Sequence, residues 1–93
     1  MRRAARTDAN KLEIVQFLRE AGCSVYDLKQ PVDLLIGKHN RTVLAELKDG
    51  RKPPSAQKYT PAQESFMSTW RGGAVVTIRD IEGAKTLVRM LDA

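Results

Sequence analysis

The sequence has a single cysteine, Cys23, a single histidine, His39, and few aromatic residues, which make up 5% of the chain. One cysteine excludes an internal disulfide, and one cysteine with one histidine cannot form a zinc site of the usual Cys/His kind. The chain also lacks an apolar run near the roughly 20 residues that span a bilayer, and no signal-peptide core follows its basic start. We therefore expect a soluble, cytoplasmic protein without thiol or zinc chemistry.

At 93 residues, the chain is long enough for one domain, 1–93, and too short for a second core. Its hydrophobic fraction of 42% is normal for a folded protein. A domain near this size buries only about 60–65% of the surface that its unfolded chain exposes, so self-association would add to its stability.

Basic residues outnumber acidic ones by 16 to 11, which gives a net charge of +5 and a pI of about 9.7. The excess lies in an N-terminal arm, 1–6, with three Arg and no acid, and in segment 38–60, with six bases and two acids. Such clusters indicate an anionic partner such as nucleic acid, although a charge run can also be only a solvated surface. The candidate DNA contacts are Arg2, Arg3, Arg6, Arg51, Lys52 and Lys58.

Apolar periodicity and turn residues predict the order α-β-β-β-α-β-α, an α/β domain with helices packed against a mixed sheet. The second helix has a clear start, because Thr60 can cap it, Pro61 suits its first position and Gln63 can complete a capping box. Trp70 at its end fits the core, while Trp70 and Tyr59 could instead stack on bases. The predicted helices cover 8–21, 61–70 and 81–91, the strands cover 23–28, 32–37, 42–48 and 74–78, and 49–55 is a loop.

The turn between the second and third strands gives the sharpest prediction. If this hairpin is symmetric about the bond between His39 and Asn40, then Asp33 lies directly opposite Glu46. Opposed residues point to one face with Cβ atoms about 4.5–5.5 Å apart, and Lys48, two residues beyond Glu46, points there as well. Two carboxylates and a lysine would therefore converge on one side of the sheet.

Opposed carboxylates destabilise a sheet unless something compensates for their charge. A divalent cation with oxygen ligands, such as Mg²⁺, would do so, and it could polarise a phosphodiester and lower the pKa of a bound water. Lys48 could then orient that water or offset charge on the phosphate. Alternatively, Asp33 and Glu46 are polar strand residues that face solvent, and Lys48 offsets their charge. A one-residue change in register would also place the two carboxylates on opposite faces of the sheet.

Six segments of the chain, two of which contain Asp33, Glu46 and Lys48, form a larger pattern. They are Thr7-Asp-Ala-Asn10, Leu18-Arg-Glu-Ala-Gly22, Val32-Asp-Leu-Leu-Ile-Gly37, Ala45-Glu-Leu-Lys-Asp-Gly50, Thr60-Pro-Ala-Gln63 and Trp70-Arg-Gly-Gly-Ala-Val-Val76. Together they resemble the PD-(D/E)XK nuclease superfamily, and within it the small stand-alone VRR-NUC proteins that are common in phage genomes and related to archaeal Holliday-junction resolvases. The resemblance extends through most of the chain.

The resemblance implies a restriction-endonuclease-like fold with a metal site at the hairpin. Asp33 and Glu46 would be metal ligands, the carbonyl of Leu47 a further ligand, and Lys48 the catalytic lysine. In the family, a glutamine on the following helix helps to position the nucleophilic water or a ligand, which gives Gln63 a catalytic role. As a capping-box residue, Gln63 would only bond the start of its own helix.

Relatives usually add an acid from the first helix. Asp8 fits the local pattern and is the preferred candidate, although it could be only a helix cap. Glu13, on the polar side of the same helix, is the other candidate.

By this resemblance we expect a Mg²⁺-dependent endodeoxyribonuclease in which Mn²⁺ can replace Mg²⁺. It would hydrolyse phosphodiester bonds in branched or distorted DNA, such as Holliday junctions or flaps, and act as a homodimer because symmetric cutting of two strands needs two sites. The alternative is a nucleic-acid-binding module of the same fold that has lost catalysis.

Overall fold

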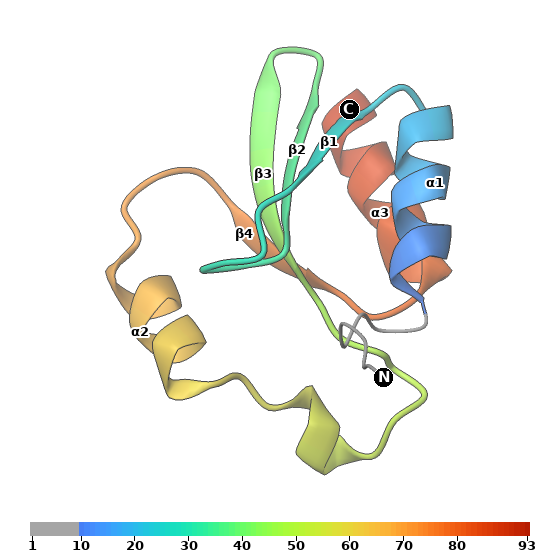
Figure 1. The fold of residues 1–93 in the computed structure, drawn as a ribbon. Coiled ribbons are helices and arrows are strands. Elements are labelled where there is room, and N and C mark those ends of the chain that lie inside the picture. The colour runs from blue at the N-terminus through green and yellow to red at the C-terminus, as the bar shows by residue number, and fades with distance from the viewer. Residues whose placement is uncertain (1–9) are drawn as a thin grey trace.

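The computed structural model describes residues 10–93, which form three α-helices, a short 3-10 helix and a four-stranded mixed sheet (Figure 1). The order α-β-β-β-α-β-α agrees with the prediction from sequence. The elements are α1 (Lys11–Glu20), β1 (Ser24–Asp27), β2 (Leu34–Lys38), β3 (Arg41–Leu47), η1 (Pro54–Gln57), α2 (Pro61–Thr69), β4 (Val75–Ile78) and α3 (Ile81–Asp92).

The strands lie in the order β1-β2-β3-β4. The first three form an antiparallel meander, whereas β4 is parallel to β3 and is reached through the long crossover that contains η1 and α2. At the β2–β3 turn, His39 and Asn40 both have positive φ, 54° and 67°, which suits a two-residue hairpin whose twist matches its strands. The pairs Leu34↔Ala45 and Lys38↔Arg41 confirm the predicted symmetry about the His39–Asn40 bond.

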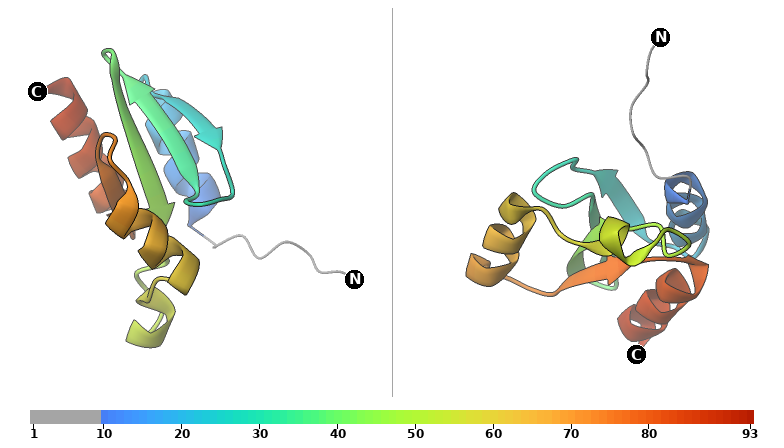
Figure 2. Two further views of the ribbon diagram at one scale, coloured as in Figure 1. Left: turned by 90° about the vertical axis from the view of Figure 1, so that its left-hand side faces the viewer. Right: turned by 90° about the horizontal axis from the view of Figure 1, so that it is seen from below.

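The core lies between one face of the sheet and the helices α1 and α3, which pack side by side (Figure 2). Alternate residues of the central strands point into it, including Leu34, Ile36, Ala45 and Leu47, which are each at most 3% exposed. On α1 and α3 the buried side chains recur at helical spacing: Ile14, Leu18, Ala84, Leu87 and Leu91. Figure 2 shows α2 on the opposite side of the sheet.

Two helix ends illustrate the local signals. The Asp80 side chain accepts a hydrogen bond from the Gly83 N–H at 2.8 Å and caps α3, as predicted. Helix α1 was expected from residue 8, but the structure begins it at Lys11, with Asn10 at the N-cap position and no side-chain cap bond. Within residues 10–93, no helix is both long enough and apolar enough to cross a membrane.

The remaining differences from the predicted elements lie at edges and in the crossover. Residues 54–55, expected in a loop, begin η1 because the proline ring fixes φ near the value that a helical turn needs. Strand β4 was expected to be buried, but only Ile78 is, because β4 is an edge strand.

Trp70 was expected in the core, and that prediction is wrong, because the residue is 45% exposed. None of the residues of α2 is buried. The Trp70 ring packs instead on Phe66 of the same helix, with ring centroids 5.3 Å apart. A helical pattern identifies an apolar side but not whether another layer covers it.

Candidate metal-dependent active site

Asp33 and Glu46, which we call the acid pair, face each other at the open end of the β2–β3 hairpin. Asp33 directly precedes β2, and continuing the pairing Leu34↔Ala45 by one residue places it opposite Glu46. The Asp33 Oδ2 atom accepts a hydrogen bond from the backbone N–H of Leu47 at 2.8 Å. The carboxylate thus extends the hydrogen bonding between β2 and β3 by one position before the first residue of β2. Glu46 is only 4% exposed, which contradicts the interpretation of this residue as a solvent-facing strand position.

The Glu46 carboxylate is buried and only partly satisfied. Its Oε2 atom accepts a hydrogen bond from Gln63 Nε2 at 2.6 Å and lies 3.7 Å from Lys48 Nζ. Its Oε1 atom is buried without a hydrogen-bond partner among the described residues. Burial raises the pKa of Glu46 from 4.5 to about 7, Asp33 adds to this through its negative charge and through a hydrogen bond with the protonated form of Glu46, and Gln63 and Lys48 oppose it.

Gln63 forms the predicted capping box and also contacts the buried carboxylate of Glu46. Its Oε1 atom accepts the N–H of Thr60 at 3.0 Å, and the Thr60 Oγ1 atom accepts the N–H of Gln63 at 3.1 Å, which forms a complete capping box. Its remaining amide hydrogens reach across to Glu46. The capping box therefore fixes the side chain that holds the buried carboxylate.

Lys48 lies between Glu46 and an aromatic ring. Its side chain is 13% exposed, and Nζ is 5.7 Å from the centre of the Tyr59 ring, within range of a cation–π contact. The Tyr59 hydroxyl is hydrogen-bonded to Thr77 Oγ1 at 2.5 Å, and Thr77 is paired with Glu46 across β3 and β4. Sequence reasoning offered Tyr59 for base stacking and overlooked Thr77, although the alternation of β4 puts Thr77 on the Glu46 face.

Asn10 is a second residue that the sequence did not reveal. It is 5% exposed, and its Nδ2 atom donates to the carbonyls of Lys48, at 3.3 Å, and Arg79, at 3.1 Å. These bonds tie the ends of β3 and β4 to the start of α1. An asparagine before a helix usually signals a cap, and here the side chain spans two strands instead.

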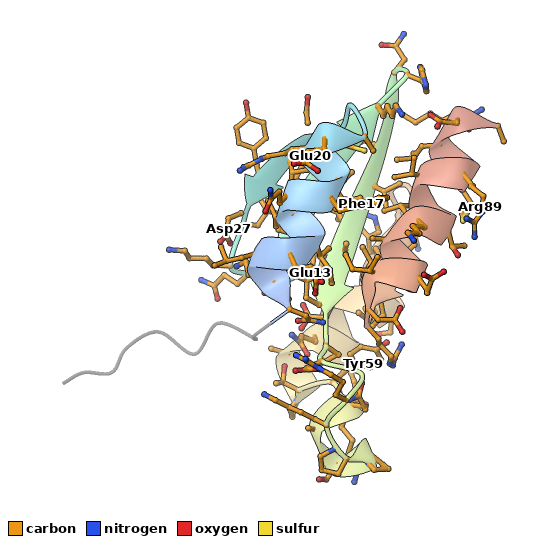
Figure 3. The ribbon with its side chains drawn as sticks, turned by 90° about the vertical axis from the view of Figure 1, so that its right-hand side faces the viewer. Glu13, Phe17, Glu20, Asp27, Tyr59 and Arg89 are labelled. Atoms are coloured by element: carbon orange, nitrogen blue, oxygen red, sulfur yellow. The ribbon has the colours of Figure 1, made fainter. Side chains whose placement is uncertain are left out.

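The two candidates for an acid from the first helix have different outcomes. Asp8 lies outside the described residues. Glu13 is exposed on the α1 and α3 side of the sheet (Figure 3), where it lines a cavity of about 310 Å³ with Asn10, Asp49 and Arg51. Since Glu46 points to the opposite face from Leu47 and the core, Glu13 and the acid pair belong to different sides of the sheet.

The basic loop after β3 is held by an acid of its own. The Arg51 guanidinium makes two hydrogen bonds of 3.0 Å to Asp49, which lower the pKa of Asp49 and raise that of Arg51. Lys52 and Lys58 are exposed in the same crossover. Arg2, Arg3 and Arg6, the other candidate DNA contacts, lie outside the described residues.

The acid pair offers oxygen ligands of the type that Mg²⁺ and Mn²⁺ take. The N–H and C=O of one residue in a strand point to the same edge, so the Leu47 carbonyl is directed to the side where its N–H meets Asp33. Within residues 10–93, no group of three or more Asp, Glu, His or Cys side chains could hold a metal. A cation here would therefore depend on Asp33, Glu46, the carbonyl of Leu47 and water.

Comparisons of the chain with protein-family models, curated proteins and solved structures gave no match. The resemblance to PD-(D/E)XK nucleases therefore depends on the sequence motifs alone.

Proposed function

We propose that the protein is a metal-dependent DNA endonuclease of the PD-(D/E)XK type, with a restriction-endonuclease-like fold of the VRR-NUC kind. The observation that carries the proposal is the buried Glu46, which faces Asp33 and keeps one oxygen unpartnered. A carboxylate at this depth with a purely structural role would normally have its oxygens satisfied, because an unsatisfied buried acceptor costs free energy. A divalent cation would satisfy that oxygen and offset the repulsion within the pair.

In this proposal, Asp33, Glu46 and the residues around them each have a role. Asp33, Glu46 and the Leu47 carbonyl would hold Mg²⁺ or Mn²⁺, which when bound polarises a phosphodiester and lowers the pKa of a water. Gln63 holds Glu46 through Oε2, so that Oε1 is left for the cation. Lys48, which the neighbouring Tyr59 ring and Glu46 keep in place, would donate to the phosphate as negative charge develops on it.

The substrate that we propose is branched or distorted DNA, and the active form is a homodimer that cuts two strands. The exposed residues Lys52 and Lys58 supply positive charge in the crossover that follows Glu46 and Lys48 in the chain. A cavity of about 420 Å³ next to Gln63, bordered by Lys29 and Thr60, leaves room for a DNA strand beside this residue. Sedimentation of the purified protein at micromolar concentration should give twice the 10.4 kDa mass of the chain.

Cleavage tests the activity directly. The wild-type protein with Mg²⁺ or Mn²⁺ is incubated with labelled four-way-junction, flap, single-stranded and linear duplex DNA, beside Glu46→Gln and Lys48→Met. Cleavage should be lost in both variants and kept in Glu64→Gln, which removes an exposed carboxylate one residue from Gln63. Binding without cleavage by the wild type would favour the alternative function, a nucleic-acid-binding module, and equal cleavage by Glu46→Gln would refute the proposed site.

Metal binding can be tested without a substrate. Calorimetric titration with Mn²⁺ should show a site that Asp33→Asn abolishes, because that change removes a charged ligand and leaves a side chain of the same shape. Asp27→Asn is the matched control, since Asp27 is paired with Lys11 on the edge strand β1. If Asp33→Asn binds Mn²⁺ as well as the wild type does, Asp33 is not a ligand.

A further inference from the structure

The face of the sheet opposite the core carries an apolar row beside the acid pair. Tyr26, Leu35, Leu44 and Val75 are consecutive partners across all four strands, and we refer to them as the apolar row. Tyr26 is 67% exposed and the other three are half-buried. Helix α2 lies on this side of the sheet but buries none of its own residues, so it leaves the row accessible.

A pocket of about 320 Å³ adjoins the apolar row. It is lined by Leu35, Thr42, Leu44, Trp70, Gly73 and Ala74, and we call it the Trp70 pocket. The indole that forms its wall is fixed, because Nε1 donates to the Gly73 carbonyl at 2.9 Å and the ring packs on Phe66. Gly72 is necessary for this arrangement, since a Cβ there would lie 2.3 Å from the Trp70 ring. The chain thus holds a half-exposed aromatic ring in one orientation over an apolar hollow.

The position of the row indicates what occupies it. Leu44 and Glu46 are two residues apart on the same face of β3, as are Leu35 and Asp33 on the neighbouring strand, which corresponds to about 7 Å. A second copy of the chain on this face would obstruct the acid pair. A single row of four side chains, about 15 Å across, is also well short of the roughly 800 Å² per partner that a stable interface buries.

We infer that this face binds unpaired bases of the DNA strand next to the bond that is cut, with one base in the Trp70 pocket. The planar faces of bases in a duplex are covered by the neighbouring bases of the stack. Unpaired bases can instead stack on aromatic and apolar side chains. The inference rests on the proposed function and narrows its substrate to DNA with unpaired nucleotides at the cut, such as flaps and boundaries between single and double strands.

Trp70 is the only tryptophan of the chain, so its fluorescence reports the contact directly. Titration of metal-free wild-type protein with an oligo-dT flap should quench this emission. Quenching should weaken when abasic sites replace the unpaired nucleotides. Trp70→Ala should weaken flap binding about 5- to 150-fold in anisotropy assays, Trp70→Phe should restore most of it, and binding to blunt duplex should be unchanged.

A second variant leaves the indole in place. Thr42→Glu puts a negative charge at the Trp70 pocket and should weaken flap binding more than Thr86→Glu, a matched change on the exposed side of α3. Equal affinity of the wild type for intact and abasic flaps, or wild-type binding by both Trp70→Ala and Thr42→Glu, would overturn the inference. Neither result would contradict metal-dependent cleavage by the acid pair. If the wild-type protein shows the quenching but does not cleave DNA, only the nuclease proposal is refuted.

Discussion

Replacing Glu46 by glutamine should remove most of the pH dependence of the stability of this domain between pH 5 and 8. Folding raises the pKa of this carboxyl from 4.5 to about 7, chiefly through burial and the charge of Asp33. Because the folded pKa is the higher one, the folded state binds the extra proton. The associated stability is complete below about pH 4.5 and is lost as the pH rises through 7.

The size of the effect follows from the same values. A pKa difference of one unit corresponds to about 1.4 kcal/mol, so the metal-free protein should lose about 2.5 kcal/mol of unfolding free energy between pH 5 and pH 8. The pKa values of Asp27, Asp49 and Asp92 are lowered from the ordinary value of 3.8, so these residues add stability that is lost as the pH falls. That loss occurs below the pH range measured here. Glu46 therefore dominates the profile in the range measured.

Urea unfolding at pH 5, 6, 7 and 8 in the presence of a chelator measures the effect. The wild type should become less stable as the pH rises, Glu46→Gln should be nearly flat, and Glu64→Gln should follow the wild type. Mg²⁺ should restore the lost stability at pH 8 more than at pH 5, because a cation favours the ionised carboxylate. A flat wild-type profile, or one that Glu46→Gln reproduces, would refute the reasoning about this site.

Two further predictions concern the crossover. Thr60→Ala and Gln63→Ala should each destabilise the domain by about 1 kcal/mol through loss of the capping box, but only Gln63→Ala should raise the pKa of Glu46 further, seen as an upward move of the stability–pH midpoint. Unchanged midpoints in both variants would limit Gln63 to capping. Arg51→Ala with Lys52→Ala should weaken DNA binding broadly and reduce the slope of log K against log salt by up to about 1.8, and an unchanged slope would remove this loop from the interface.

The sequence was sufficient to predict the central hairpin and the position of Glu46. Two turn residues, His39 and Asn40, set the register, and the period of two along the strands then determines which side chains share a face. The capping box at Gln63 was equally predictable, because its bonds are local. Such features depend on residues close together in the chain.

What the sequence did not reveal depends on contacts between distant segments. The bonds from Asn10 to the carbonyls of Lys48 and Arg79 join the start of α1 to the ends of two strands. The exposure of Trp70 depends on whether another layer covers the end of α2, which the apolar spacing of the helix does not determine.

The crossover between β3 and β4 separates two demands that proteins often make of the same residues. Stability resides in the layer formed by the sheet with α1 and α3, while Lys48, Tyr59, Gln63 and Trp70 belong to a connection whose helix buries nothing. Insertions and substitutions at exposed positions of that connection, outside the capping box, can therefore accumulate at little cost to folding. Selection could change which DNA is bound, and how, while the core that supports the acid pair stays the same.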